Sequence, residues 1–497
     1  MANLLHGLGG SNRRRQGYGG PPTSLRQGYG GPPKQGEGGS LTRRRKTRLY
    51  RRSLFGGSVA TGLRCGVLSG AAALGCQPRL SSEDKMNVKH GMLSTVAIFL
   101  GFSALVAVQV GAQDYTQWRG PNRDGAVLSF KAPASWPERL TQRWKVEVGL
   151  GYATPLVVGD RIYMFSRQAD NEVMSAVDAA TGKVLWQTGY PAPFTMSSAA
   201  TRHGPGPKST PVFANGKLYA IGMTGIVTAY DAATGKQLWQ KPAPGVVPMY
   251  TSHSFSPLVD RGLVIFHVGG HNQGALTAFD VNTGEIKWSW NGDGPGYGSP
   301  IVADLGGTRQ IITITQGKLV GVDAATGSLL WERPFVSSNF TNSVTPILVG
   351  QTLIMSNGGP LIAVTVTRRN NQWVTENAWE NADVPFRLSN AVIVGDMLFG
   401  LSTRNAGQYF GVDAKTGKTL WTSEGRQAGQ AAIAKAGDLL FSLEDDGELV
   451  VARNSLTAFE VLKRYKVADT ETWAQAAISG NRIFVKDLAA LALWTVN

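Results

Sequence analysis

The stretch DAATGKVLW, at residues 178–186, decides the fold of this 497-residue chain because its pattern returns four more times. The pattern D-x-x-T-G-x-x-x-W recurs as DAATGKQLW (231–239), DVNTGEIKW (280–288), DAATGSLLW (323–331) and DAKTGKTLW (413–421). Successive aspartates are 53, 49, 43 and 90 residues apart. The last spacing equals two units of 45 and predicts a degenerate copy in between. Such a period indicates a repeat architecture.

Each copy predicts a β-hairpin. Alternating residues such as SAVD and KVLW predict two strands. The aspartate can accept backbone N–H groups in the turn, and the glycine takes the positive-φ position. The indole is predicted to pack against the neighbouring unit and to donate its N–H to a backbone carbonyl. The structural repeat residues are Asp178, Gly182, Trp186, Asp231, Gly235, Trp239, Asp280, Gly284, Trp288, Asp323, Gly327, Trp331, Asp413, Gly417 and Trp421.

A second signature marks the innermost strand of each unit. Five copies are Thr154-Pro155, Thr210-Pro211, Ser256-Pro257, Ser299-Pro300 and Thr345-Pro346, and related starts lie near Asn390-Ala391, Gln430-Ala431 and Gln475-Ala476. Eight units with four strands each predict an all-β, eight-bladed β-propeller. The last unit has room for only three strands, so RWKVEVG at 143–149 is expected to supply the fourth and close the ring. A two-domain β protein with coincidental spacing is the alternative.

The unit A-x-D-x-x-T-G-x-x-x-W, complete at 176–186, resembles the tryptophan-docking repeat of quinoprotein dehydrogenases and of a wider set of pyrroloquinoline-quinone (PQQ) repeat propellers. QWRGPNRDG at 117–125 resembles the start of exported bacterial members of that set. The dehydrogenase branch implies PQQ under an adjacent Cys–Cys disulfide, a calcium ion and an Asp base. The non-enzymatic branch includes the propeller lipoprotein of the outer-membrane barrel-assembly machinery.

The positions of the cysteines differ from what either branch of the family implies. Both cysteines, Cys65 and Cys76, precede residue 113, so the predicted propeller has no disulfide, and no C-x-x-C-H haem motif occurs. No lipobox cysteine stands at the predicted cleavage site, which leaves the membrane anchor of the lipoprotein without its attachment point. We therefore predict no cofactor, and PQQ with calcium stays the alternative.

Three segments divide the chain. Residues 1–85 carry 15 basic and 3 acidic residues in low-complexity sequence, and are expected to be disordered or to stem from a misassigned start codon, an RNA-binding tail being the alternative. Residues 86–112 predict a cleavable signal peptide starting at Met86, with a transmembrane anchor or an earlier twin-arginine signal as alternatives. Residues 113–497 form the propeller, whose 33 basic and 31 acidic residues offer no broad field for nucleic acid.

Candidate site residues lie in the predicted loops that connect an outer strand to the next inner strand. These loops surround the axis of a propeller on one face, where function usually lies. Together they predict a polar, partly cationic pocket with aromatic walls, suited to an anionic or sugar-like ligand. The alternative is a set of residues that only bind one another and water. The ligand-binding candidates are Arg202, His203, Lys208, His253, Arg387, Arg426 and Trp473.

The sequence shows neither a phosphate loop nor a nucleophile elbow. His267 and His271 flank a Gly-Gly turn, so their i,i+4 spacing does not predict a metal site. We predict an exported, monomeric binding scaffold in the periplasm or outside the cell, without catalysis, nucleic acid or stable membrane anchor. Its partner is a protein or a small polar ligand on the axial face. A PQQ-dependent dehydrogenase is the first alternative, and a hydrolase or lyase is the second.

Overall fold

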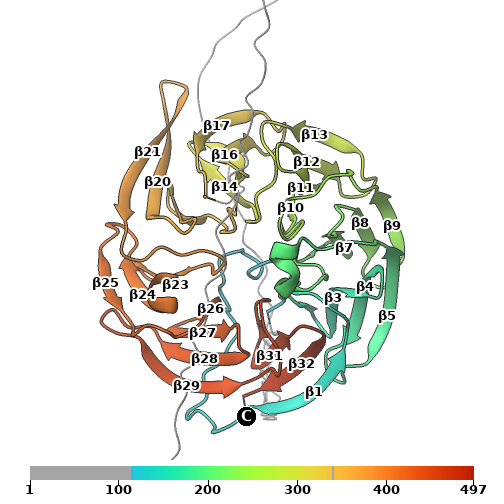
Figure 1. Ribbon diagram of the computed structural model, residues 1–497, viewed down its shortest axis with the longest axis vertical. Coiled ribbons are helices and arrows are strands. Elements are labelled where there is room, and N and C mark those ends of the chain that lie inside the picture. The colour runs from blue at the N-terminus through green and yellow to red at the C-terminus, as the bar shows by residue number, and fades with distance from the viewer. Residues whose placement is uncertain (1–112, 339–340, 497) are drawn as a thin grey trace, which may run out of the picture. The chain divides into compact units, whose positions relative to one another are not determined.

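The computed structural model describes residues 113–338 and 341–496. Thirty-two strands in this part of the chain form eight four-stranded antiparallel sheets, which lie as blades around one axis (Figure 1). The predicted all-β, eight-bladed propeller is therefore confirmed. None of the helices in these residues has the length and apolar character of a membrane span. The predicted tail (1–85) and signal peptide (86–112) lie outside the described residues and stay predictions.

The strands follow one another in sets of four. Blades 1 to 4 are β2 (Leu156–Val158), β3 (Arg161–Gln168), β4 (Asn171–Asp178), β5 (Val184–Pro191); β6 (Val212–Ala214), β7 (Lys217–Ile221), β8 (Val227–Asp231), β9 (Gln237–Lys241); β10 (Leu258–Asp260), β11 (Leu263–Gly270), β12 (Gln273–Asp280), β13 (Ile286–Trp290); and β14 (Ile301–Leu305), β15 (Thr308–Ile314), β16 (Lys318–Asp323), β17 (Leu329–Pro334).

Blades 5 to 8 are β18 (Ile347–Val349), β19 (Thr352–Met355), β20 (Leu361–Arg369), β21 (Gln372–Asn381); β22 (Val392–Val394), β23 (Met397–Ser402), β24 (Gln408–Asp413), β25 (Thr419–Thr422); β26 (Ala431–Ala436), β27 (Leu439–Glu444), β28 (Glu448–Arg453), β29 (Glu460–Lys466); and β30 (Ala477–Ser479), β31 (Arg482–Lys486), β32 (Ala490–Thr495), β1 (Thr141–Glu147). Two short 3-10 helices, η1 (Ser198–His203) and η2 (Arg404–Ala406), lie in the connections.

The Asp-Thr-Gly turns join the third and fourth strands of a blade. Asp178 Oδ1 accepts the Thr181 N–H at 2.8 Å and the Thr181 hydroxyl at 2.7 Å, which holds the pKa of Asp178 below its ordinary value. Gly182 follows with a φ of 74°, where a side chain would be strained. The same bonds to aspartate recur at Asp231 and Asp413. The turn chemistry expected from the sequence is therefore present.

The tryptophan of one blade packs on the turn of the next. A Cβ placed on Gly284 would lie 2.7 Å from the Trp239 ring, and Trp239 Nε1 donates to the Val281 carbonyl at 3.2 Å. Blade 5 has no Asp-Thr-Gly turn, so Trp331 has no such glycine to meet. Its Nε1 instead donates to Gln310 Oε1 of its own blade at 2.7 Å. The expected indole bond to a backbone carbonyl of the next blade is therefore made by Trp239, Trp288 and Trp421, the last to Ser455 of a blade without the Asp-Thr-Gly turn. It is absent for Trp331 and for Trp186, whose Nε1 meets no partner among the described residues.

The Ser/Thr-Pro starts form a second set of links near the axis, which we call the inner girdle. Each backbone N–H donates to the side chain that starts the next blade: Thr154 to Thr210 (3.0 Å), Thr210 to Ser256 (3.0 Å), Ser256 to Ser299 (3.0 Å), Ser299 to Thr345 (3.2 Å), Thr345 to Asn390 (2.8 Å), and Gln475 to Thr154 (3.3 Å). All six donors are buried, so these bonds satisfy groups that water does not reach. The sequence identified these positions, and the structure shows that their side chains accept hydrogen bonds from the preceding blade.

The ring closes as expected. β1 pairs antiparallel with β32, with Trp144 opposite Leu493, so the first strand completes the last blade. The degenerate copy between Asp323 and Asp413 is blade 5, whose β20 and β21 are joined by Asn370 and Asn371 at positive φ. Its Trp379 still packs on a glycine of the next blade. The hydrophobic core is divided into clusters, most of which lie between neighbouring blades.

Candidate functional site

A pocket of about 310 Å³ lies on the axis of the ring. Its walls come from the loops between outer and inner strands, and η1 lies close to the centre of the ring in Figure 1. The lining residues are Trp118, Tyr152, Ala200, His203, Lys208, Tyr250, Thr251, Ser254, Tyr297, Ser299, Thr341, Ser343, Thr345, Arg387, Leu388, Asn390 and Trp473. The volume is near the lower end of the range for small-molecule sites, roughly 300–1,000 Å³.

An element that the sequence did not predict crosses the axis. Residues 115–127, which we call the strap, bridge to the inner strands of blades 1 and 7 (Figure 1, cyan). Side chains of the strap also bind residues that precede the inner strands of blades 3, 5 and 6. Tyr115 bridges to Val157 of blade 1, and Val127 N donates to the Lys435 carbonyl of blade 7 at 2.8 Å. Trp118 lines the pocket and donates its indole N–H to Thr345 Oγ1 at 3.1 Å. The strap thus contributes one pocket wall and ties the blades together.

Two arginines of the strap are buried. Arg119 donates to the Ala391 carbonyl at 2.7 Å, and Arg123 donates to the Pro257 carbonyl at 2.9 Å. Burial lowers the pKa of Arg119 to about 10 and that of Arg123 to about 9. Both therefore stay charged at neutral pH. Neither of them forms an ion pair with a carboxylate within the described residues, and backbone carbonyls accept their N–H groups instead.

The pocket itself is lined by cations and by no carboxylate among the described residues. Lys208 Nζ donates to the carbonyls of Gly204 and Gly206, each at 2.7 Å. Burial lowers the pKa of Lys208 to about 7. Arg387 is half-buried, and no hydrogen bond or ion pair engages its guanidinium in the part of the chain that the structure describes. The guanidinium of Arg387 is therefore available to a ligand.

Aromatic and hydroxyl groups make up most of the remaining wall. His203 meets Trp473 edge to face, with ring centroids 4.7 Å apart, and Tyr152 lies 6.4 Å from the same indole. The Tyr297 hydroxyl accepts the backbone N–H of Tyr250 at 3.0 Å, which fixes the Tyr297 ring. These contacts hold the aromatic rings in place before any ligand arrives.

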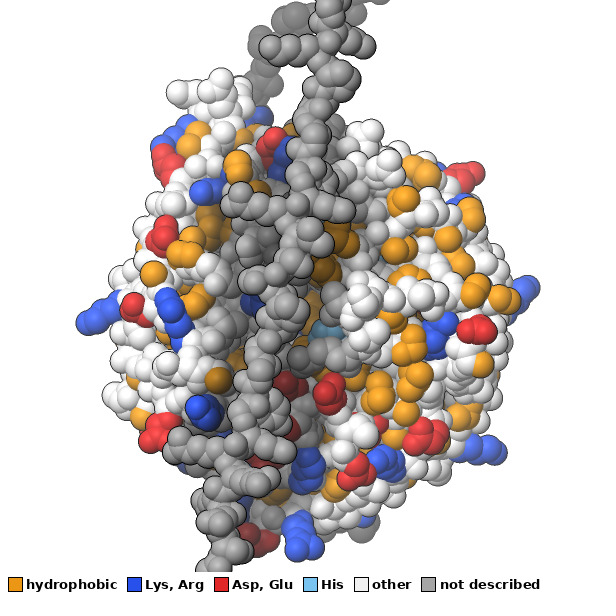
Figure 2. All heavy atoms as spheres, viewed as in Figure 1, with side chains coloured by type: hydrophobic (Ala, Val, Ile, Leu, Met, Phe, Trp, Pro, Cys, Tyr) orange, Lys and Arg blue, Asp and Glu red, His pale blue; other side chains and the backbone are white. Residues whose placement is uncertain are grey.

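Figure 2 shows the face of the ring seen in Figure 1. Hydrophobic side chains gather over the half that carries β8 to β13, whereas charged side chains are spaced mostly along the edge. Two of the exposed hydrophobic residues, Val246 and Met249, lie in the loop after β9, which also supplies Tyr250 to the pocket. Apolar side chains therefore lie beside the pocket on this face.

The structure brings four of the seven predicted ligand-binding residues into the pocket: His203, Lys208, Arg387 and Trp473. His253 is fully buried close to Gly225 and Met223, and burial lowers its pKa to about 4. Arg426 is exposed on the loop before β26 and does not line the pocket. Arg202 lies on η1, and its side chain is outside the described part of the structure.

Sequence reasoning missed Trp118 and the hydroxyl groups. The motif QWRGPNRDG contained Trp118, Arg119 and Arg123, and two large cations next to a tryptophan in an otherwise weakly charged region were the available signal. The hydroxyls of Ser299 and Thr345 belong to the Ser/Thr-Pro positions where inner strands begin. Because inner strands surround the axis, the repeat could have identified these two hydroxyls as pocket residues.

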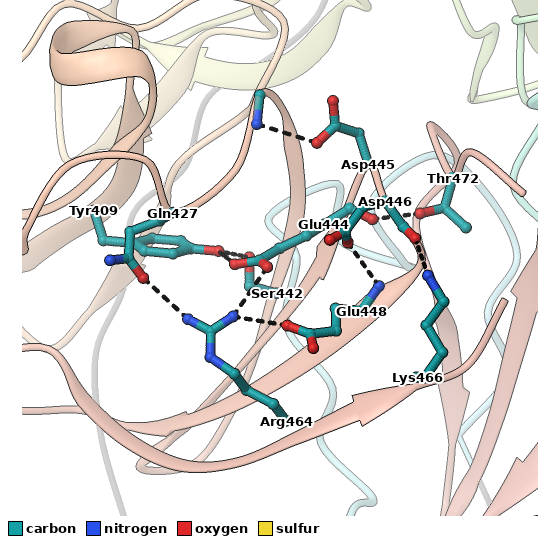
Figure 3. Close-up of polar contacts among 11 residues, drawn as sticks. Tyr409, Gln427, Ser442, Glu444, Asp445, Asp446, Glu448, Arg464, Lys466 and Thr472 are labelled. Carbon is teal, nitrogen blue, oxygen red and sulfur yellow. Dashed lines mark hydrogen bonds and ion pairs between the residues drawn. The ribbon is translucent and has the colours of Figure 1, made fainter. Parts of the chain in front are cut away.

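A second polar cluster lies on the same face, where β27 turns into β28 (Figure 3). Glu444 is almost completely buried and accepts the Tyr409 hydroxyl at 2.7 Å and Arg464 Nη1 at 3.1 Å. Burial raises the pKa of Glu444 to about 7. The Glu444 carbonyl accepts the Thr472 hydroxyl, and Thr472 precedes Trp473 of the pocket wall. The cluster thus fixes the loop that carries one side of the pocket.

The residues at the pocket do not fit a calcium-dependent quinone. Calcium takes six to eight oxygen ligands, with carboxylates prominent, and none of the described residues that line the pocket carries a carboxylate. The nearby Asp293 carboxylate already accepts the N–H of Gly294 and Gly317 at 2.8 and 2.9 Å. His267 is buried against Phe255, and residues 113–338 and 341–496 hold no group of three potential metal ligands.

Comparisons with known proteins identify the family to which the chain belongs. A family model described as outer membrane protein assembly factor BamB matches residues 169–423, just over half of the chain. The assembly factor BamB of Burkholderia pseudomallei (strain K96243) is 26% identical over 301 residues, which cover 57% of this chain and 69% of that protein. The dehydrogenase subunit of the quinone alcohol dehydrogenase of Acetobacter aceti is 34% identical over 148 residues, 27% of this chain. That match covers 19% of the subunit, so the chain spans about a fifth of that relative's length.

Two solved structures share the fold. BamB from Moraxella catarrhalis superposes with a TM-score of 0.51 at 17% identity, over 72% of this chain and 97% of that one. The quinohemoprotein alcohol dehydrogenase ADHIIG from Pseudomonas putida HK5 superposes with a TM-score of 0.57 at 14% identity, over 77% and 80%. At these identities the likeness concerns the fold alone.

Proposed function

The chain belongs to the family described as outer membrane protein assembly factor BamB, and from this premise we propose that it is an exported propeller that binds a ligand or partner and catalyses nothing. The observation that carries the proposal is the axial pocket. The described residues of its lining offer aromatic rings and a free guanidinium, but no carboxylate and no nucleophile paired with a base. Such a wall can hold a molecule, and the amine of Lys208 is engaged by two carbonyls and not by a base.

The premise also supports a place in the cell envelope. The Burkholderia relative is named as an outer membrane assembly factor, and the segment at 86–112 reads as an export signal. We propose a periplasmic or secreted monomer whose axial face is the binding face. The exposed Val246 and Met249 beside the pocket add apolar area for a protein partner there.

A quinone-dependent dehydrogenase is the second candidate. It is favoured by the 34% identity to the Acetobacter subunit. PQQ would supply a two-electron acceptor, and Arg387 and Lys208 of the lining would be the residues to hold its carboxylates. The described lining offers no carboxylate ligand for the calcium that accompanies such a quinone, and this favours the binding role.

Turnover separates the two candidates. The purified chain is incubated with PQQ and calcium and assayed for dye reduction with ethanol and with glucose. We expect no reduction above the rate without protein. Quinone-dependent turnover that disappears in Arg387→Gln overturns the proposal. Retention of a defined envelope protein by the wild-type chain, and its loss in Trp473→Ala but not in Arg426→Gln, supports it.

A further inference from the structure

We propose that the axial pocket takes an acidic saccharide, with its sugar ring against the aromatic wall and its carboxylate on Arg387. This inference rests on the proposed binding function and names the ligand class of the same site. It is carried by three features of the wall: the rings, the unused hydroxyls and the single unengaged cation.

The rings come from distant parts of the chain. Trp118 lies on the strap, Tyr152 precedes β2, Tyr250 and Tyr297 lie in the loops around blade 3, and Trp473 precedes β30. A sugar ring has an apolar C–H face and a rim of hydroxyls, so it packs its flat face on such rings and leaves its edge for hydrogen bonds. Trp473 is held edge to face by His203, so its indole is already fixed in the pocket wall.

The wall also offers hydroxyl groups that the protein does not use. The side-chain hydroxyls of Thr251 and Thr341 line the pocket and meet no hydrogen-bond partner among the described residues. Ser343 accepts only a long bond from the Leu388 N–H, at 3.3 Å. Groups that can both donate and accept suit the hydroxyls of a sugar, because each of those also does both. A flat apolar ligand would leave them unpaired.

The guanidinium of Arg387 favours a ligand that carries one anionic group. Arg387 has no partner in the described residues, whereas Lys208 is already held by two carbonyls. The buried guanidinium groups of Arg119 and Arg123 add a positive field from the strap. A carboxylate on Arg387 would form a charge-assisted, two-pronged contact. One free guanidinium fits one carboxylate on the ligand.

Two other ligand classes fit less well. A planar aromatic polycarboxylate needs several free cations, and the described residues of the lining offer one, Arg387. A folded acidic peptide is larger than the 310 Å³ available, although a single acidic side chain of a partner enters easily. The pocket therefore favours a small, hydroxyl-rich, singly charged molecule.

The test compares two matched pairs of sugars. The purified chain is titrated with glucuronate and glucose, and with cellobiouronic acid and cellobiose, by calorimetry and by tryptophan fluorescence. We expect the acidic member of each pair to bind about tenfold or more tightly, because a hydrogen bond to a charged group contributes about 1.5–3 kcal/mol. Raising the salt concentration should reduce this difference.

Variants identify the residue responsible. Arg387→Gln should abolish the preference for the acidic sugar, and Arg426→Gln, which changes an exposed arginine of the same face, should leave it intact. Thermal melting checks that each variant folds. Thr341→Val gives an independent readout, since it should weaken the acidic and neutral sugars equally. Equal affinity for both members of each pair, or an unchanged preference in Arg387→Gln, overturns the inference.

The outcomes for the ligand and for the proposed function remain separate. Analysis of the sugar after incubation should show an unchanged molecule. Cleavage or oxidation of a bound acidic sugar overturns the absence of catalysis and leaves the ligand class standing. Binding of PQQ alone, with no acidic sugar bound, overturns the ligand class.

Discussion

At the scale of single residues, glycine and tryptophan join the blades. Gly216 and Gly235 belong to the same blade and share a φ of 74°. A Cβ on Gly235 would lie 2.4 Å from the Trp186 ring, whereas a Cβ on Gly216 would meet nothing within 4 Å. Gly235 therefore requires glycine both for its positive φ and for the contact with Trp186, whereas Gly216 requires it only for its positive φ.

This pair gives a direct prediction. Gly216→Ala should lower the free energy of unfolding by about 1 kcal/mol, the cost of an L residue at positive φ. Gly235→Ala should lower it by roughly 3 kcal/mol, because the methyl group must also displace Trp186. Urea denaturation of both variants measures the difference. Equal losses would show that the indole contributes nothing at the turn.

The inner girdle allows a second prediction. Thr210 Oγ1 accepts the buried Thr154 N–H, so Thr210→Val should leave that N–H without a partner and cost about 1–3 kcal/mol. Thr181→Val, which removes an exposed hydroxyl bonded to Asp178, is the control and should cost less. Thermal melts compare the two, and a smaller loss for Thr210→Val contradicts the girdle.

Glu444 gives a prediction that depends on pH. Its pKa is about 7 in the folded protein, above its ordinary value of 4.5, so the folded state binds the proton more tightly. Its ionisation therefore destabilises the fold, and stability falls as the pH rises from about 4.5 through 7. In Glu444→Gln this part of the fall should disappear. The melting temperature at pH 5 and at pH 8, compared with the wild-type chain, measures it, and parallel curves contradict the assignment.

At the scale of elements, the strap and the closing strand matter most. Trp118 is part of the pocket wall and donates to Thr345, whereas Leu128 is 73% exposed just past the strap. Trp118→Ala should lower the melting temperature by a few degrees and weaken ligand binding, since it removes both a ring and a hydrogen bond. Leu128→Ala should change neither. A stable Trp118→Ala with full binding would remove the strap from the site.

At the scale of the whole molecule, the ring depends on its last pair of strands. A chain starting at Leu150 lacks the strap and β1, so β32 becomes an open edge. We expect a lower melting temperature and self-association, because an open edge pairs with other chains. Light scattering after size-exclusion chromatography checks this, with Leu128→Ala as the intact control. A monodisperse and equally stable truncated chain would contradict ring closure as a source of stability.

The sequence by itself determined the repeat and therefore the blades. Asp178, Gly182 and Trp186 act through neighbours a few residues away or one repeat on, and such contacts recur at a fixed spacing that is visible in the letters. The 90-residue spacing between Asp323 and Asp413 predicted that a degenerate blade, blade 5, lies between them. The spacing did not predict the different turn of that blade or the changed hydrogen-bond partner of Trp331. Four pocket residues could be named because the repeat places their loops at the axis.

Only the tertiary structure decided which of these side chains meet. Trp118 and Thr345 are 227 residues apart, and the strap reaches the axis through contacts with blades that no local pattern links to it. His253 and Arg426 lie in the expected loops, yet one is buried and the other is exposed, because the packing of each loop orients its side chains. A repeat fixes where a loop begins and ends, whereas the direction of each side chain in it depends on non-repeating neighbours across the ring.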